Sequence, residues 1–485
     1  MCHSVLPEGN YVFSVLSRLG RRGRGSARLA AAALVSGLVV TGAISGTGTA
    51  FADDVNKEQG GASATLGGLE TYGTAVIHDG GRDEKVSAGL FRMSVDGGGM
   101  LQTYCIDLHN PTQTDAKYQE TSWSGTSLNG NAEAGRIRWI LQNSYPQVND
   151  LAALARKAGA GALTEQDAAA GTQVAIWRYS DQADVDAVSP AAEKLADYLQ
   201  KSARQLAEPQ ASLTLTPGAL SGRPGERLGP VTVHTNADAV TVTPPAAAGG
   251  VRVVDKSGKP VDSAADGSQV FFDVPEDAAP GSAALTVQAS TTVPVGRAFT
   301  AETRSQTQIL AGSSESTVSA TATANWASAG AVPALSARKN CAKGGVDITA
   351  VNGGEKPFTF SLMGVEHTIE AGATRTVTIP LQEDQAYDFT IKGPHGFEKR
   401  LRGVLDCRTV AAAVVGAEDD GLTTQATIQP SPASVGGTGV DGADLAETGA
   451  SNATPVIVGI AVLLVVVGGA ALVLVRKKKA PTEGE

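Results

Sequence analysis

The chain has 485 residues, of which 42% are hydrophobic, 18% charged and only 5% aromatic. This length allows roughly three domains, and 57 Gly with 22 Pro favour several small β-rich units over one large core. A net charge of −10 argues against nucleic-acid binding, and four Cys with six His are too few for a zinc array or an iron–sulfur protein. We therefore expect no cofactor, no bound metal and no nucleic-acid partner.

The N-terminal residues 1–52 have the features of a secretory signal peptide. Several Arg precede an apolar run at 29–44, and small residues then lead to Ala-Phe-Ala at 50–52. Basic residues, a short apolar run and an A-x-A site in this order are typical of a cleaved signal. An uncleaved membrane anchor is the alternative, but Gly and Ser interrupt the short apolar run. We predict that the mature chain starts near Asp53, with a linker over 53–63.

Residues 64–206 combine strand and helix patterns and predict an α+β domain. Two β-type runs, 86–95 and 101–108, flank the sequence Asp-Gly-Gly-Gly at 96–99, which indicates a hairpin. Helical patterns follow, the third of them over 165–179. Polar residues that can cap these helices precede each pattern. The predicted N-caps are Asn131, Asn149, Thr164 and Ser189.

Two further β-rich units and a stalk are predicted beyond residue 206. Residues 211–332 are rich in Thr, Val and Ala, with short alternating runs between turns, and predict a β-sandwich of immunoglobulin-like type. Residues 337–409 predict a smaller β-sandwich by the same signs. Over 410–444 the chain has almost no large apolar residue, so we expect a disordered, flexible stalk.

The predicted mature chain keeps three of the four cysteines, so they cannot all pair in disulfides. Cys341 and Cys407 bracket the smaller β-unit, and an exported protein folds in an oxidising environment, so we predict a disulfide between them. Cys105 is then left without a partner. An unpaired thiol on an exported protein is a liability unless it is buried, reactive or already used in another bond.

Gln173 is a second unusual residue. Its neighbours three and four positions away on the predicted helix are all apolar, which places its side chain on the face toward the core. Burying an amide without hydrogen-bond partners costs about 1–3 kcal/mol or more. A strand Cys and a buried helix Gln together suggest an internal thioester. In this reaction the Cys105 thiolate attacks the side-chain carboxamide of Gln173, ammonia leaves, and the sulfur becomes acylated. The apolar neighbours are Ala169, Ala170, Ile176 and Trp177.

Two motifs in this region resemble those of a known family. Residues 104–107 read Tyr-Cys-Ile-Asp and residues 172–177 read Thr-Gln-Val-Ala-Ile-Trp, which resemble the two motifs of the thioester (TQxA) domains of Gram-positive surface adhesins. The resemblance covers about residues 64–206 and implies a Cys105–Gln173 cross-link. It also implies flanking roles for four residues of the motifs. These are Tyr104, Asp107, Thr172 and Trp177.

The C-terminal segment 445–485 resembles the sorting signal of Gram-positive surface proteins, in the LAxTG form common in actinobacteria. Residues 445–449 read Leu-Ala-Glu-Thr-Gly, and an unbroken apolar stretch over 456–475 is long enough to span a bilayer before a basic tail. The resemblance implies that a sortase cuts between Thr448 and Gly449 and links Thr448 to peptidoglycan. An ordinary membrane anchor is the alternative. We therefore expect an exported protein anchored to the cell wall.

These features predict a surface adhesin that captures amine-bearing proteins or glycans covalently, and that is not an enzyme. Two other classes are open. A cysteine transpeptidase or amidase would need a His against the Cys105 thiolate, and the first domain offers only His78 and His109. A non-covalent adhesin or wall structural protein would need no chemistry at Cys105. Neither the amine target nor a Lys–Asn isopeptide bond in the β-units can be read from the sequence.

Overall fold

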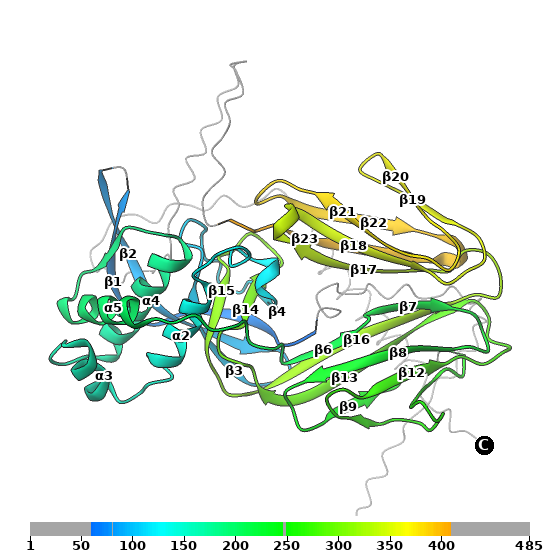
Figure 1. The fold of residues 1–485 in the computed structure, drawn as a ribbon, viewed down its shortest axis with the longest axis horizontal. Coiled ribbons are helices and arrows are strands. Elements are labelled where there is room, and N and C mark those ends of the chain that lie inside the picture. Colours follow the sequence, from blue (N-terminus) through cyan, green and yellow to red (C-terminus); the bar gives the residue numbers. More distant parts are fainter. Residues whose placement is uncertain (1–59, 80, 246–248, 409–485) are drawn as a thin grey trace, which may run out of the picture. The chain divides into compact units, whose positions relative to one another are not determined.

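The computed structural model describes residues 60–79, 81–245 and 249–408 (Figure 1). The predicted signal peptide, stalk and sorting signal lie outside the described residues, as does most of the 53–63 linker. No helix within the described ranges is long and apolar enough to cross a membrane. The predicted span at 456–475 is therefore untested.

The first sheet closes on itself. The long strand β1 pairs with β2 along its whole length and with β4 near its start, and β2 leads through β3, β15 and β14 back to β4. A further short strand, β5, pairs with β1 near the end of that strand, at residues 75–77. The strands are β1 (Ser63–Asp79), β2 (Arg82–Val95), β3 (Met100–Cys105), β4 (Lys117–Thr121), β5 (Val185–Ala187), β14 (Ala298–Ala301) and β15 (Gln308–Ser313).

Two strands of this ring come from far along the chain. β14 and β15 lie inside the segment 211–332, yet they pair with β4 and β3 of the first domain, and Figure 1 shows them beside the strands of the N-terminal part. The predicted boundary near residue 206 therefore does not separate two independent domains. The physical reason is that β3 and β4 would otherwise be left with unpaired edges, and sequence patterning carries no signal for a partner about 200 residues away.

The hairpin between β2 and β3 forms as predicted. Gly97, Gly98 and Gly99 all have positive φ, at 86°, 117° and 107°, a conformation that glycine adopts without steric cost. β3 ends at Cys105, earlier than the predicted end at residue 108.

Helices follow the strands β1–β4 along the chain. Thr164 caps α4 in a full capping box with Asp167, and Ser189 precedes α5 with proline at its first position. The caps of α2 and α3 are instead Glu133 and Asp150, one or two residues beyond the predicted Asn131 and Asn149. The helices are η1 (Trp123–Gly125), α2 (Ala134–Asn143), α3 (Leu151–Ala158), α4 (Glu165–Ser180) and α5 (Pro190–Ser202).

Helix α4 is the most enclosed of these elements. All of its residues from Ala168 to Trp177 are buried. Gly171 allows α5 to approach closely, since a Cβ there would meet the carbonyl oxygen of Ala192 at 2.4 Å. The polar residues of this stretch are therefore held in an apolar, tightly packed setting.

Two sheets within residues 213–326 share one apolar core. One has the order β10-β12-β8-β6 and the other β11-β9-β13-β16-β7. Inward residues of both sheets pack in one cluster, but an immunoglobulin-like topology stays a prediction. The strands are β6 (Leu213–Thr216), β7 (Ala219–Gly222), β8 (Arg227–Thr235), β9 (Val240–Thr243), β10 (Arg252–Val254), β11 (Ser263–Ala264), β12 (Gln269–Asp273), β13 (Gly281–Thr292) and β16 (Glu315–Trp326).

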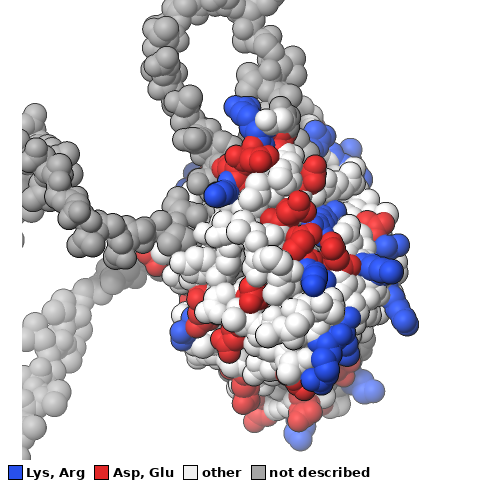
Figure 2. Space-filling model, turned by 90° about the vertical axis from the view of Figure 1, so that its left-hand side faces the viewer, with Lys and Arg blue, Asp and Glu red and all other residues white. Residues whose placement is uncertain are grey.

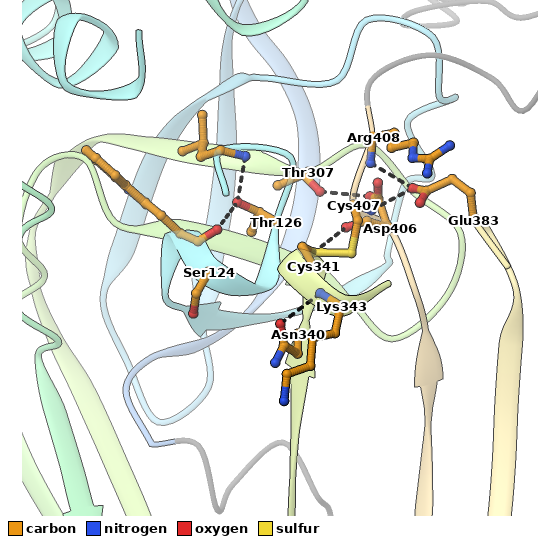
Figure 3. Close-up of a disulfide and its surroundings, with 12 residues drawn as sticks. Ser124, Thr126, Thr307, Asn340, Cys341, Lys343, Glu383, Asp406, Cys407 and Arg408 are labelled. Atoms are coloured by element: carbon orange, nitrogen blue, oxygen red, sulfur yellow. Dashed lines mark hydrogen bonds between the residues drawn. A yellow bond between two sulfur atoms is a disulfide. The ribbon is translucent and has the colours of Figure 1, made fainter. Parts of the chain in front are cut away.

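The third part of the chain has its own apolar cluster and three small antiparallel sheets. Cys341 and Cys407, the pair expected from the sequence, are joined by a disulfide (Figure 3). The elements are β17 (Pro333–Asn340), η2 (Cys341–Lys343), β18 (Gly345–Asn352), β19 (Phe358–Leu362), β20 (Val365–Ile369), β21 (Thr374–Pro380), β22 (Ala386–Lys392), η3 (Pro394–Gly396) and β23 (Glu398–Val404).

Removing the disulfide should destabilise this third part selectively. The bond closes a loop with a sequence separation of 66, for which the loop-entropy treatment gives about 3–5 kcal/mol. We expect the double variant Cys341→Ala/Cys407→Ala to lower the melting temperature of this part, measured by calorimetry on the exported protein. Reduction of the wild type should have the same effect. Free thiols at both positions under non-reducing alkylation would contradict the prediction.

Candidate functional site

Cys105 lies at the point where β3 ends. Its side chain is 1% exposed and packs in the same apolar cluster as Leu101, Tyr118 and Phe299. Directly across the sheet lies Gln308 of β15. Cys105 is a free thiol in the structure, enclosed by strands from two distant parts of the chain.

The side-chain amide of Gln173 meets Cys105. The main-chain N–H of Cys105 donates to Oε1 of Gln173 at 3.0 Å, and Nε2 of Gln173 donates to the carbonyl oxygen of Cys105 at 2.8 Å. Gln173 is 1% exposed, so this double hydrogen bond forms in a dry environment. The pair that the sequence singled out is therefore brought together across 68 residues, with a donor already aimed at the carbonyl oxygen that would carry negative charge during acyl transfer.

The sulfur of Cys105 contacts the main chain just beyond the strand. It donates to the carbonyl oxygen of Asp107 at 3.3 Å and accepts from the Asp107 N–H at 3.4 Å. The sequence predicted a strand as far as residue 108, but β3 ends at Cys105. Asp107 is therefore part of a turn that folds back on the sulfur. Burial raises the pKa of the thiol well above its usual value, and the carboxyl groups of Asp107 and Asp181 raise it further.

Acidic side chains surround this turn. The carboxyl group of Asp107 is fully buried; Oδ2 accepts from Asn110 at 2.6 Å, whereas Oδ1 has no donor. Burial raises the pKa of Asp107 well above its usual value, with further contributions from Asp406 and Asp181. Asp181, whose Oδ1 accepts from the N–H of Leu108 at 2.8 Å, has its pKa raised to about 7 by burial.

Sequence reasoning missed the contributions from the later parts of the chain. Thr307 accepts a hydrogen bond from the N–H of Ile106 through its carbonyl oxygen, and its hydroxyl donates to Asp406 at 2.8 Å (Figure 3). Burial raises the pKa of Asp406 to about 6. No sequence signal could have placed Thr307 and Asp406 here, because both arrive through long-range packing.

Tyr104 and Thr172, from the same two motifs, form hydrogen bonds to the segments packed around Cys105 and Gln173. The hydroxyl of Tyr104 donates to the carbonyl oxygen of Tyr145 at 2.9 Å. That of Thr172 donates to the carbonyl oxygen of Ala168 at 2.6 Å and lies 2.7 Å from the hydroxyl of Ser144. Both motifs are thereby tied to the chain that follows α2. The indole of Trp177 is buried one turn beyond Gln173.

A cysteine enzyme would need a histidine that is hydrogen-bonded to the Cys105 sulfur. Nδ1 of His78 lies 2.8 Å from Asp83 and its Nε2 lies 3.4 Å from Asp186. In the described ranges no hydrogen bond joins a histidine, His109 included, to the sulfur of Cys105. The arrangement around Cys105 thus differs from a Cys–His pair.

One group of carboxylates has the spacing of a cation site. Ligand atoms of Glu383, Asp384 and Asp406 lie within 4.8 Å of one another. Each has a protein partner: main-chain N–H groups of residues 407 and 408 for Glu383, Arg304 at 2.9 Å for Asp384, and Thr307 for Asp406. Oδ1 of Asp384 and Oδ1 of Asp406 form no hydrogen bond within the described residues, and we assign no metal to the group.

The surface on the helical side is of mixed charge. Figure 2 shows acidic and basic side chains interspersed over this face. A field of one sign would select oppositely charged partners. Because both signs of charge are mixed on the face shown, the charge pattern there does not favour one class of amine.

The comparisons with known proteins point to the same segment. Residues 102–205 match the family described as "Thioester domain", and residues 331–404 match that described as "Bacterial phospholipase C, C-terminal domain". Among curated proteins none matches the chain. The chain thus contains a segment similar to thioester domains, and this segment includes both Cys105 and Gln173.

Three solved structures are also similar. They are the Bacillus anthracis TIE protein (17% identity, TM-score 0.26, covering 71% of this chain and 64% of that one) and the thioester domain of the Enterococcus faecium TIE86 protein (16%, 0.26, 55% and 97%). The third is the thioester domain of the Staphylococcus aureus TIE protein (13%, 0.22, 56% and 99%). The chain thus spans slightly less than two thirds of the first.

Proposed function

We propose that this protein is a surface adhesin that forms an internal thioester between Cys105 and Gln173 and captures amine-bearing partners covalently. The observation that supports it best is the reciprocal hydrogen bonding of the Gln173 amide to Cys105 in a site nearly closed to water. The match of residues 102–205 to the thioester domain family supports it independently.

The formation step balances within the chain. The sulfur of Cys105 adds to the amide carbon of Gln173, the S–C bond forms and the C–N bond breaks. The amide nitrogen leaves as ammonia with the thiol proton. The N–H of Cys105, 3.0 Å from Oε1, stabilises the charge that develops on that oxygen. Holding both groups in one packed site supplies the proximity that this acylation needs.

The capture step is a single event. An amine adds to the Gln173 carbonyl carbon, the S–C bond breaks, and Cys105 regains a proton from the incoming nitrogen. The partner stays attached through an amide bond, so the protein is consumed and is not an enzyme. Exclusion of water protects the thioester until an amine is positioned.

Intact mass of freshly purified exported protein tests the proposal. The cross-linked chain is expected to be lighter than its sequence by one ammonia, about 17 Da, because the acyl group is transferred within the chain. Methylamine should then add one amine to this mass. A full, uncyclised mass with a titratable Cys105 thiol would overturn the proposal and leave the non-covalent adhesin as the better reading.

We also propose that the protein is exported and linked to the cell wall. The support is the order of signal peptide, LAxTG pentapeptide, apolar stretch and basic tail in the sequence. The partners in this step are a sortase and peptidoglycan, with Thr448 as the residue that becomes linked.

The variant Thr448→Ala tests the anchor. We expect it to move the protein from the cell-wall fraction to the membrane and secreted fractions, because the acyl group that a sortase transfers belongs to Thr448. Fractionation followed by immunoblotting measures the shift, and the neighbouring Thr454→Ala serves as the control. Wall attachment that persists in Thr448→Ala would overturn the sortase proposal and point to another linkage to the wall.

A further inference from the structure

The indole N–H of Trp177 is a buried donor without an acceptor. Trp177 is 2% exposed, and its Nε1 forms no hydrogen bond in the described part of the chain. Trp123 and Trp326 differ, since each donates to a main-chain carbonyl oxygen, at 2.9 Å and 2.8 Å. An unsatisfied buried donor is costly, so this N–H calls for a physical explanation.

The position of Trp177 suggests which atom it serves. It follows Gln173 by four residues on α4, and residues at this spacing lie on the same helix face. Both side chains are buried, and Gln173 contacts Cys105 directly. The indole N–H is thus an unused donor one helical turn from the side chain that contacts Cys105, and its presence partly opposes the rise that burial causes in the thiol pKa.

The chemistry at this sulfur needs such a donor. Burial and the carboxyl groups of Asp107 and Asp181 disfavour a thiolate at Cys105, yet opening a thioester expels sulfur as a thiolate. Among the described residues, the Asp107 N–H at 3.4 Å is the one main-chain donor to the sulfur. A second donor would offset the unfavourable environment at the moment when charge develops.

We propose that the indole N–H of Trp177 hydrogen-bonds the sulfur of Cys105 as the thioester opens, and so sets the rate of amine capture. The electron pair of the breaking S–C bond goes to sulfur, and the indole keeps its proton throughout. The proton lost by the incoming amine neutralises the thiolate afterwards. This inference rests on the proposed thioester and adds to it a residue that acts on the leaving group.

The variant Trp177→Phe removes the N–H and keeps most of the aromatic volume. A hydrogen bond to a charged group corresponds to roughly a 10- to 100-fold effect, so we expect methylamine capture, followed by intact mass on the full chain, to slow by that factor. Trp326→Phe is the matched control, because the indole N–H of Trp326 already donates to the carbonyl oxygen of Ala279, outside the closed first sheet. This variant should capture methylamine at the wild-type rate.

Indole ¹⁵N–¹H signals provide a readout that needs no variant of the site. The chain has four Trp, and the Trp177 signal, assigned by its loss in Trp177→Phe, should shift when methylamine opens the wild-type thioester. The Trp326 signal should stay in place. If Trp177→Phe folds but never cyclises, this shift alone decides the inference.

Failure of the inference is distinguishable from failure of the proposed function. A wild-type mass without the ammonia deficit would remove the thioester itself. A normal deficit, combined with an unshifted Trp177 signal, would overturn only the role of the indole and leave Trp177 as packing. A normal deficit with wild-type capture rates in Trp177→Phe would do the same.

Discussion

Replacing Cys105 with Ala is expected to abolish covalent amine capture while leaving the fold nearly intact. The side chain is small and buried, so its truncation removes little volume, whereas no other residue near Gln173 offers a thiol in the described ranges. Intact mass should show neither the ammonia deficit nor the addition of methylamine. Cys105→Ala protein that still gains methylamine would show that capture uses another group.

The companion variant Gln173→Ala should also end capture, but with a cost in stability. It removes both hydrogen bonds to the main chain of Cys105, and unsatisfied buried groups cost about 1–3 kcal/mol each. A free thiol should appear at Cys105. The exposed Gln166 lies on the same helix, so Gln166→Ala is the control and should capture methylamine normally. Melting curves separate lost chemistry from lost structure.

Glu120→Ala is expected to lower the free energy of unfolding of the closed first sheet by about 3–5 kcal/mol, because it leaves the buried guanidinium of Arg297 without its main counter-ion. Glu120 and Arg297 are 2% and 5% exposed, and Oε1 of Glu120 accepts from Nε of Arg297 at 2.9 Å. Glu120 also accepts from the N–H groups of Ala62 and Ser212. Urea unfolding, monitored by fluorescence, measures the change.

The control for this ion pair lies on the same guanidinium. Glu208 contacts Arg297 at 2.8 Å but its side chain is 32% exposed, so Glu208→Ala should cost about 1 kcal/mol or less. Because Arg297 immediately precedes β14, the Glu120 variant should also loosen the strands that enclose Cys105, and amine capture should fall with stability. Equal effects of the two variants would contradict the importance of the buried pair.

Several features of the site could be derived from local sequence. The capping residue Thr164 and the apolar neighbours of Gln173 define a buried helix face, and a glycine-rich turn defines the hairpin that leads to Cys105. These signals are short-range, because caps, turns and helix periodicity depend on residues within a few positions of one another. The pairing of the odd cysteine with the buried amide also followed from such arguments.

The amino-acid sequence was thus enough to predict that Cys341 and Cys407 are bonded to each other and that Cys105 and Gln173 lie together. Tertiary structure alone decided what surrounds that pair. It ended β3 at Cys105 so that Asp107 turns back on the sulfur, and it brought Thr307 and Asp406 beside the pair. These placements depend on strand pairing and burial between residues some 200 to 300 positions apart, which hydrophobic patterning does not encode, because an alternating strand is compatible with many partners.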